Sequence, residues 1–381
     1  MNKNNMNKSS SGNSNPIFVL FSGHNDRAII ALCRFFSMKE IDFCIICSSG
    51  KDLIFKTTWA NKILFSRIDL NIDIDIFRIV SESLRENYGD LFYPVYCPTT
   101  EFINQFVLNN KKSISKLGWT INLPDADVYS SLTNKFLSKE IIKKIIEIKI
   151  PDELSWDNLK TPCVLKPISN IFDGKINYPL LCRSKEDLII ALKEINPINW
   201  FSQKIIDGQS YYLCAYLTRD GQSTHFWQQN LLQQPSGKSM LLARSVINPG
   251  IDLSFLFEKL HEMGYYGPFM MEVIQDEKDD FYYIEINPRF WGPLQLALDA
   301  CPDILNLFVN DSIGENKFKI NENFEENTIE HWYSWKFGAE KNDLKKYPAL
   351  INLERKKPIQ DFLEEFDVYA KRDTILLHGK Y

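Results

Sequence analysis

Two glutamates, Glu272 and Glu285, lie in a segment whose pattern predicts a β-hairpin. The apolar, aromatic-rich runs Pro268–Ile274 and Phe281–Ile286 flank the acidic segment Gln275–Asp280, which has the composition of a turn. Each run therefore carries one carboxylate among apolar neighbours. An unpaired charge is costly to bury in such surroundings, so both carboxylates need a positively charged partner.

The expected register brings the two carboxylates together. If Asp276 pairs with Phe281 across a four-residue loop, Glu272 lies directly opposite Glu285. The period of two along a strand places Asn287 on the same face as Glu285. Carboxylates facing each other at about 5 Å repel, and a divalent cation removes that repulsion. Because carboxylate and amide oxygens are hard ligands suited to Mg²⁺, the sequence predicts a metal site formed by these three side chains.

Arg289 follows this group by two residues, and its bidentate guanidinium can hold phosphate oxygens. The alternative is a surface hairpin whose glutamates form a polar outer face. In that case Asn287-Pro288-Arg289 would be an unusual way to leave the strand.

These residues resemble the metal-binding hairpin of the ATP-grasp superfamily, whose members include D-alanine–D-alanine ligase, biotin carboxylase and the large subunit of carbamoyl phosphate synthetase. The resemblance rests on the spacing of the two glutamates and on the Asn-Pro-Arg sequence after the second. It covers residues 16–312, loosely at first and well over residues 135–293. It implies a mixed α/β and α+β fold, with an N-terminal doubly wound parallel α/β lobe followed by a two-subdomain ATP-grasp fold.

The composition agrees with a globular enzyme of several lobes. The chain has 381 residues, of which 44% are hydrophobic and 24% charged. A net charge of −5 gives no reason to expect a nucleic-acid partner. No apolar run approaches the roughly 20 residues that a membrane-spanning helix needs. Residues 1–15 are Asn-, Ser- and Lys-rich and predict a disordered tail without the apolar core of a secretory signal, so we expect a cytoplasmic protein.

Eight scattered cysteines fit a reducing compartment. Cys44 and Cys47 form a C-x-x-C, but they fall on a predicted strand, where residues three apart point to opposite faces. The five histidines offer no zinc-binding group.

Strands alternate with helices in residues 16–125, which predicts a parallel sheet. The predicted elements, in chain order, are strand Ile17–Phe21, helix Asn25–Ser37, strand Ile41–Cys47, helix Asp73–Asn87, strand Leu91–Tyr96 and helix Thr99–Asn109. The turn after the first strand has one glycine and lacks the G-x-G-x-x-G of a dinucleotide site. His24, Asn25 and Arg27 lie at the carboxyl edge of the first strand, either facing a ligand or capping and covering the helix.

Two lysines of the next segment are candidates for phosphate binding. Helix Asn134–Lys149 begins with Lys135, and strand Pro162–Pro167 contains Lys166. By resemblance they contact the α- and β-phosphates of ATP. A lone charge in the apolar strand needs an anion, which supports this role for Lys166. The alternative for Lys166 is a lysine at the end of the strand that reaches solvent. The alternative for Lys135 is an exposed helix residue.

A loop and a linker complete the expected nucleotide site. Ser169–Lys175 resembles the loop that covers the triphosphate in ATP-grasp enzymes, but it has a single glycine. Either Lys175 and the Gly174 amide bind the phosphates here, or the loop contributes less. Near the end of strand Trp200–Gly208, the resemblance places the Gln203 side chain and the Lys204 carbonyl at the exocyclic amine of adenine, and the Ile206 N–H at a ring nitrogen. The carboxylate that usually binds ribose is replaced by Gln209-Ser210.

Arg244 stands in the apolar run Leu241–Ser245, ahead of a helix predicted over Ile251–Gly264. By resemblance it touches the γ-phosphate or the acyl phosphate, and together with Arg289 it is a predicted catalytic residue. The alternative is a structural ion pair.

The expected domains are a tail (1–15), an N-terminal α/β domain (16–125), an ATP-grasp domain (126–312, divided into subdomains 126–202 and 203–312) and a C-terminal extension packed on the body (313–381). The resemblance implies an ADP-forming ligase that uses ATP and two Mg²⁺ ions, for which Mn²⁺ can substitute, to join a small-molecule carboxylate to an amine. A homodimer is an expected assembly. Two alternatives stay open, namely a bicarbonate-activating carbamoyl- or carboxyl-transfer enzyme and a nucleotide-binding regulatory protein without turnover.

Overall fold

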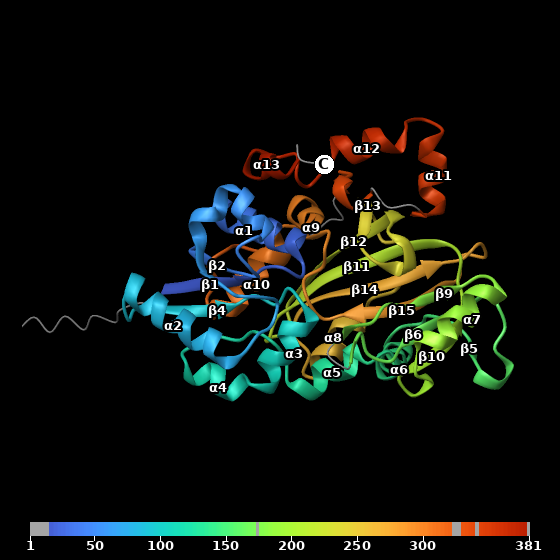
Figure 1. Ribbon diagram of the computed structural model, residues 1–381, viewed down its shortest axis with the longest axis horizontal. Helices are drawn as coiled ribbons and strands as arrows, with labels where there is room; N and C mark the ends of the chain where they lie inside the picture. Colours follow the sequence, from blue (N-terminus) through green and yellow to red (C-terminus); the bar gives the residue numbers. More distant parts are fainter. Residues whose placement is uncertain (1–14, 173–174, 322–328, 340–342, 379–381) are drawn as a thin grey trace, which may run out of the picture.

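The computed structural model describes residues 15–172, 175–321, 329–339 and 343–378. Figure 1 shows an N-terminal lobe on one side, a large antiparallel sheet at the centre, a small sheet on the other side, and the C-terminal helices above the large sheet. In this described part of the chain, no helix combines the length and hydrophobicity required to cross a bilayer. The predicted tail lies outside the described residues except for Asn15, which begins the first strand.

The N-terminal lobe is a parallel sheet with the strand order β3-β2-β1-β4. Its strands are β1 (Asn15–Phe21), β2 (Phe43–Cys47), β3 (Ile63–Ser66) and β4 (Phe92–Tyr96), and its helices are α1 (Asp26–Met38), α2 (Ile74–Tyr88), α3 (Glu101–Asn109) and α4 (Lys111–Lys116). Phe18 and Leu20 pack in the same core as α1, whereas Val19 and Phe21 pack in the core that includes α2 and α3. Helices therefore cover both faces, and the predicted doubly wound lobe is confirmed. The short β3 and the polar α4 were not predicted.

The two cysteines of the C-x-x-C motif lie on opposite faces of β2, as predicted. Cys44 belongs to the core on the α2 side and Cys47 to the core on the α1 side. All eight cysteines are buried free thiols, so this motif is part of the core.

The small sheet is antiparallel with the order β5-β10-β6-β9. Its strands are β5 (Glu153–Leu154), β6 (Cys163–Pro167), β9 (Leu180–Cys182) and β10 (Trp200–Lys204), with β7 (Ile171–Phe172) and β8 (Lys175–Ile176) as a separate pair and α7 (Lys185–Glu194) beside β9. A capping box between Ser184 and Asp187 begins α7. The subdomain boundary predicted after residue 202 falls inside β10, so the change of sheet comes after Lys204.

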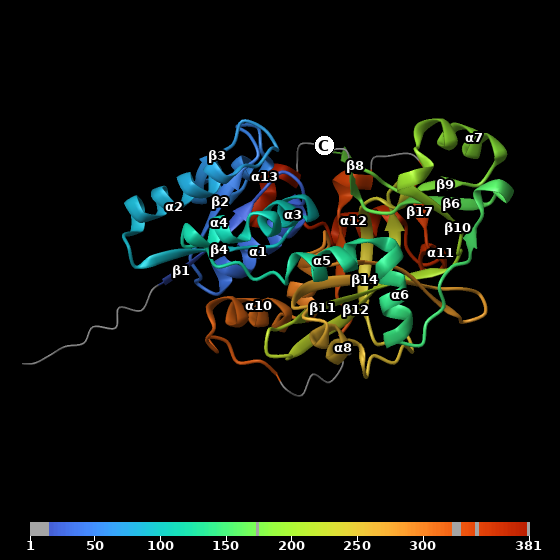
Figure 2. The ribbon, with the colours of Figure 1, turned by 90° about the horizontal axis from the view of Figure 1, so that it is seen from below.

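The large sheet has the order β15-β14-β11-β12-β13-β16, and β17 pairs with β12. Its strands are β11 (Gln209–Leu217), β12 (Ser223–Gln233), β13 (Met240–Val246), β14 (Gly267–Gln275), β15 (Phe281–Asn287), β16 (Trp332–Ser334) and β17 (Lys345–Lys346). The helices α5 (Ala126–Thr133), α6 (Lys135–Ile145) and α8 (Leu256–Glu262) pack on one face, and α5 and α6 cross it in Figure 2. The helices α9 (Leu294–Ala300) and α10 (Asp303–Ile313) pack on the other face in one continuous core with α1.

The described residues of the C-terminal segment, 331–339 and 343–378, pack against the large sheet and the N-terminal lobe. Its helices are α11 (Pro348–Glu354), α12 (Ile359–Glu365) and α13 (Ile375–His378). Leu350, Phe362 and Leu363 share a core with Leu231 and Leu242 of the large sheet. Two short strands, β16 and β17, pair with β13 and β12, so backbone hydrogen bonds also join this segment to the sheet.

A buried arginine joins the C-terminal segment to the N-terminal lobe. Arg34 of α1 is 5% exposed, and it donates to Asp373 Oδ1 at 2.6 Å and Oδ2 at 2.9 Å. It also donates to the Gln295 side chain at 2.8 Å and to the Val368 carbonyl at 2.8 Å. The guanidinium is therefore surrounded by acceptors from two separate parts of the chain, α9 and residues 368–374.

Replacement of Arg34 by methionine is expected to lower the free energy of unfolding by about 3–5 kcal/mol, because a half-buried carboxylate loses its cation. Chemical denaturation measures this change. Arg85→Ala is the control, since the Arg85–Asp90 pair is exposed (63% and 86%) and such pairs contribute about 1 kcal/mol or less. Equal losses in the two variants would show that the buried network does not stabilise the fold.

Candidate nucleotide and metal site

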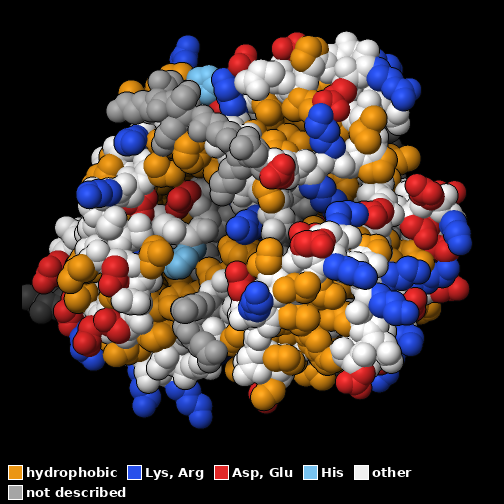
Figure 3. Space-filling model, turned by 45° about the vertical axis from the view of Figure 1, so that its right-hand side comes forward, with side chains coloured by type: hydrophobic (Ala, Val, Ile, Leu, Met, Phe, Trp, Pro, Cys, Tyr) orange, Lys and Arg blue, Asp and Glu red, His pale blue; other side chains and the backbone are white. Residues whose placement is uncertain are grey.

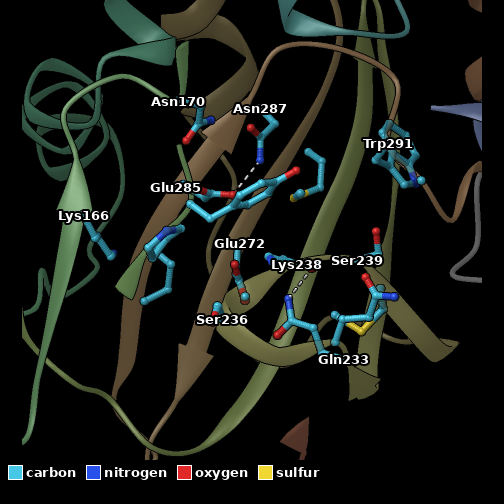
Figure 4. A pocket seen from close by; sticks show the side chains of 18 of the residues that line it. Lys166, Asn170, Gln233, Ser236, Lys238, Ser239, Glu272, Glu285, Asn287 and Trp291 are labelled. Carbon is cyan, nitrogen blue, oxygen red and sulfur yellow. Dashed lines mark hydrogen bonds between the residues drawn. The ribbon is translucent and has the colours of Figure 1, made fainter. Parts of the chain in front are cut away.

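A pocket of about 570 Å³ lies between the small and large sheets and extends to the N-terminal lobe. Figure 4 shows Glu272, Glu285 and Asn287 on neighbouring strands at its centre, with Lys166 approaching from a separate strand. The pocket is lined by eight of the eleven residues that the sequence predicted: Lys135, Lys166, Lys204, Ile206, Glu272, Glu285, Asn287 and Arg289. Segments from the whole length of the chain therefore meet at one cavity.

The predicted pairing of the two glutamates is confirmed, but by a different register. Gln275, rather than Asp276, pairs with Phe281, which lengthens the loop by one residue. A β-bulge at Ile284 then adds one residue to β15, and Glu272 lies opposite Glu285. The longer loop shifts the strand pairing by one residue, and the bulge shifts it back by one residue. Glu272 and Glu285 therefore lie opposite each other.

The two carboxylates have opposite electrostatic environments. Burial, together with the charge of Glu285, raises the pKa of Glu272, which accepts a hydrogen bond from Ser210 at 2.8 Å. Burial also acts to raise the pKa of Glu285, but Lys135 and the Asn287 amide outweigh it and hold the value at about 2. Lys135 Nζ lies 3.0 Å from Glu285 Oε2, and Asn287 Nδ2 lies 2.8 Å from Glu285 Oε1. Glu285 is therefore ionised throughout the physiological range.

The donor set fits a magnesium ion. The carboxylates of Glu272 and Glu285 face each other, and Asn287 lies beside them with its amide nitrogen on Glu285 (Figure 4), so a rotation of its amide would offer an oxygen to a metal. Among the described residues, no group of three or more His, Cys, Asp or Glu side chains gathers in a form that could hold a metal.

Lys166 is a buried cation without an ionic partner. It is 7% exposed, and among the described residues no side chain forms an ion pair or hydrogen bond with its ammonium group. Burial, reinforced by the charge of Lys135, lowers the pKa of Lys166 to about 8, while Glu285 and Glu272 oppose that change. The solvent-exposed alternative for this lysine is therefore wrong. An anion bound in the pocket would supply the missing charge.

Nucleotide affinity is expected to fall as the pH rises above about 8. Lys166 is charged below that pH, and a bound phosphate favours the charged form, so the pKa is higher in the complex than in the free protein. Calorimetric titration with a non-hydrolysable ATP analogue and Mg²⁺, between about pH 6.5 and about pH 9.5, measures this dependence. Lys166→Arg should flatten the profile because arginine keeps its charge. Identical profiles in both proteins would assign the pH dependence to another group.

Lys135 is also buried, at 5% exposure, and so the exposed-helix alternative is wrong for it as well. Asn134 caps α6 by accepting hydrogen bonds from the N–H groups of Phe136 and Leu137. This cap starts the helix at Lys135 and points its first side chain towards Glu285.

The linker after β10 lies at the edge of the pocket where the sequence predicts adenine. Lys204 and Ile206 line the pocket, and the Ile206 N–H has no hydrogen-bond partner among the described residues. Gly208 lets the linker approach β14 closely, because an added Cβ would lie 2.0 Å from the Gln275 carbonyl oxygen. The free N–H is the group that the sequence assigned to a ring nitrogen.

The side chain of Gln203 does not reach the pocket. It is 3% exposed and donates to the Pro151 carbonyl at 3.3 Å, which holds β10 next to the preceding segment. The predicted contact between this side chain and adenine is therefore not present in this arrangement. The sequence could not reveal this, because the face of β10 that Gln203 occupies depends on the neighbouring strand.

Arg244 lies on the other face of the large sheet. It pairs with Gln229 of β12, which pairs with Tyr211 of β11, and residues directly opposite share a face. The Glu272 side chain belongs to the alternate face, with its partner Tyr212. Arg244 donates to Gln229 at 2.8 Å and forms an ion pair with Glu330 at 2.7 Å. The structure thus favours the structural ion pair. Arg244 does not line the pocket, and the prediction that it is a catalytic residue is wrong for this arrangement.

Arg289 lines the pocket and donates to the Phe290 carbonyl at 3.1 Å. It has no ion pair with a described residue, so its guanidinium is available to a phosphate. The side chain of Lys175 lies outside the described residues, as does Gly174. Their predicted role in covering the triphosphate stays a prediction.

The N-terminal lobe contributes pocket residues that sequence reasoning missed or left open. Glu101, at the start of α3, is 7% exposed and has a pKa raised by burial, against the opposing charge of Arg289. It accepts a hydrogen bond from Asn170 at 3.2 Å. His24 also lines the pocket, and its Nε2 is buried without a hydrogen-bond partner. Arg27 lines the pocket as well, and it donates to Ser239 at 2.9 Å and to the Met240 carbonyl, so it links the lobe to the large sheet.

Charged side chains of both signs lie on the surface of the molecule (Figure 3). Among the coloured side chains of the face in Figure 3, Lys and Arg are interspersed with Asp and Glu.

Comparisons with solved structures identify the fold. The biotin carboxylase domain of Hydrogenobacter thermophilus 2-oxoglutarate carboxylase, a dimer in complex with MgADP, ADP and bicarbonate, matches with a TM-score of 0.60 and 16% identity over 80% of this chain and 71% of that chain. Campylobacter jejuni biotin carboxylase in complex with β-γ-ATP gives 0.57 and 14% over 80% and 72%. An ADP complex of N5-carboxyaminoimidazole ribonucleotide synthetase gives 0.56 and 16% over 81% and 78%.

The chain therefore has the fold of these enzymes, which is the ATP-grasp fold that the hairpin predicted. No protein-family model matches the sequence, and no curated protein matches it significantly. At such low identity the likeness establishes the fold, and the activity has to be argued from the site.

Proposed function

We propose that this protein is an ATP-dependent, ADP-forming ligase that joins a small-molecule carboxylate to an amine. The observation that carries the proposal is the facing pair of the buried Glu272 and the partly buried Glu285, next to the buried Lys135 and Lys166 in one pocket. This combination of two carboxylates and two cations suits a magnesium-bound triphosphate. The ADP, MgADP and ATP-analogue complexes of the structural neighbours support the same choice of ligand.

In the proposed reaction, a carboxylate oxygen of the substrate attacks the γ-phosphorus of ATP. The bond from that phosphorus to the β–γ bridging oxygen breaks, and ADP and an acyl phosphate result. The amine nitrogen then attacks the acyl carbon, the bond from that carbon to the phosphate oxygen breaks, and the nitrogen loses a proton. Inorganic phosphate leaves, and the product is an amide.

Each pocket residue has a part in this scheme. Glu272, Glu285 and Asn287 would hold Mg²⁺, two ions in our proposal, which neutralises phosphate charge during transfer. Lys135 and Lys166 bind the phosphates, and Arg289 stabilises the negative charge that develops on the transferred group. Glu101 lies on the N-terminal side of the pocket, where it can accept a hydrogen bond from the amine substrate. The Ile206 N–H orients adenine.

A bicarbonate-activating enzyme is the second candidate. It is favoured by the bicarbonate bound in the 2-oxoglutarate carboxylase neighbour. Bicarbonate would take the place of the organic carboxylate, and the intermediate formed in place of the acyl phosphate would be carboxyphosphate. The dimer of that neighbour also makes a homodimer our proposed assembly.

A screen for ADP release tests the proposal. The purified protein is incubated with ATP, Mg²⁺ and pairs of carboxylates and amines, and products are identified by mass spectrometry. Release that requires both an organic carboxylate and an amine supports the ligase. Release with bicarbonate in the absence of an amine supports the second candidate. ATP binding without release across the whole panel would reject both in favour of a regulatory nucleotide-binding protein.

A further inference from the structure

Lys345 enters the pocket from the C-terminal segment, which the ATP-grasp resemblance does not cover. In β17 it pairs with Gln233 of β12, and Lys346 pairs with Leu232. Successive strand residues point to opposite faces. Lys345 accordingly lines the pocket, whereas Lys346 forms an ion pair with Glu354 at 2.7 Å on the outer side. Two adjacent lysines thus have different environments.

Lys345 has no anionic partner at its ammonium group. Among the described residues it forms no ion pair or hydrogen bond, and its Nζ lies 4.5 Å from the centroid of the Tyr347 ring. The nearby carboxylates are engaged elsewhere, since Glu272 accepts from Ser210 and Asp207 forms an ion pair with Arg183 at 2.8 Å. Burial lowers the pKa of Lys345 despite the attraction of these carboxylates. A partly desolvated cation in this position is stabilised when an anion enters the pocket.

Buried hydrogen bonds fix the backbone next to Lys345. The Tyr347 hydroxyl donates to Gln233 Oε1 at 2.6 Å, and the Tyr347 N–H donates to the Leu231 carbonyl at 3.0 Å. The Ala349 N–H donates to Gln209 Oε1 at 2.9 Å. Tyr347 is 1% exposed. These hydrogen bonds therefore hold the backbone that carries the Lys345 side chain in a fixed position on the sheet.

Gln209 connects the C-terminal segment to the large sheet. It follows the Gly208 turn, where the ATP-grasp pattern leads one to expect a carboxylate for ribose. Here its amide instead binds three backbone groups: Oε1 accepts from the Ala349 N–H, and Nε2 donates to the carbonyls of Ser210 and Asn230, the latter at 2.6 Å. The residue at this position thus holds the C-terminal segment against the sheet, and that segment brings a cation to the pocket.

We propose that Lys345 binds the phosphate chain of the nucleotide and that the C-terminal segment is therefore one wall of the nucleotide site. This inference rests on the proposed function, because it requires that the pocket binds ATP. It adds a third lysine, from a separate part of the chain, to Lys135 and Lys166.

Binding of two ligands to matched variants tests the inference. Calorimetric titration measures the affinity of wild type, Lys345→Ala and Lys346→Ala for a non-hydrolysable ATP analogue with Mg²⁺, and for adenosine. Lys345→Ala should weaken binding of the analogue roughly tenfold to a hundredfold, the effect of losing one charge-assisted contact. Its affinity for adenosine should stay the same, and Lys346→Ala should bind both ligands like wild type.

The outcomes separate this inference from the proposed function. If wild type binds the analogue, Lys166→Ala weakens it and Lys345→Ala does not, then the role of Lys345 is rejected and the proposed function stands. Equal weakening of the analogue and adenosine in Lys345→Ala would also reject a phosphate contact, because it would indicate a displaced segment. If wild type does not bind the analogue, the proposed function fails and the inference fails with it.

Discussion

Replacement of Glu285 by glutamine is expected to reduce ATP-dependent ADP release at least about a hundredfold. The change keeps the size of the side chain and an oxygen that can accept from Asn287, but it removes the charge that a magnesium ion needs. Glu285 is the carboxylate that its surroundings keep ionised, with a pKa of about 2. Loss of this charge should therefore affect metal and phosphate binding more than loss of any other group in the pocket.

Two further variants make the result on Glu285 interpretable. Glu285→Gln leaves the buried Lys135 without its ion pair, which itself destabilises the protein. Glu272→Gln keeps that pair and should still reduce turnover strongly. Glu277→Gln changes an exposed glutamate at the tip of the same hairpin and should behave like wild type. An unchanged rate of ADP release in both Glu272→Gln and Glu285→Gln would remove the basis of the metal site.

Replacement of Lys166 by alanine is expected to weaken nucleotide binding tenfold to a hundredfold, because a charge-assisted hydrogen bond contributes about 1.5–3 kcal/mol. The reason is structural, since this lysine is 7% exposed and has no ionic partner among the described residues. Calorimetric titration with the ATP analogue measures the effect directly.

Lys166→Ala should be at least as stable as the wild type in the absence of nucleotide, because an unpaired buried cation is costly in the free protein. Thermal unfolding without nucleotide tests this point. Lys160→Ala is the control, because Lys160 is exposed in the same subdomain. If Lys166→Ala and Lys160→Ala bind the analogue equally well, Lys166 does not contact the phosphates.

Local patterns in the sequence were sufficient to predict the hairpin, the doubly wound lobe and the lysine in β6. Alternation of apolar and polar residues marks strands, and a lone charge in an apolar strand marks a site. The register was harder, since Glu272 and Glu285 meet through a longer loop and a compensating bulge at Ile284. A bulge leaves no reliable signal in one sequence, and so the correct pairing was reached by an incorrect register.

Long-range pairing explains the residues that were missed or misplaced. Arg244 and Gln203 were assigned by their position along the chain, but the face that each occupies is set by neighbouring strands. Lys345 reaches the pocket because β17 pairs with β12, more than a hundred residues earlier. Glu101 arrives with the N-terminal lobe. The local sequence around a lone acidic or basic residue in a polar segment does not indicate that its side chain will line a pocket formed by distant parts of the chain.

The network around Arg34 has a consequence for synthesis of the protein on the ribosome. Its partner Asp373 follows 339 residues later, and translation at about 5–20 residues per second takes roughly 20 to 70 seconds to cover that distance. During this interval the Arg34 guanidinium lacks the Asp373 carboxylate, its ionic partner in the finished molecule. Arg34 therefore gains its full set of acceptors only when residues 368–374 have been synthesised.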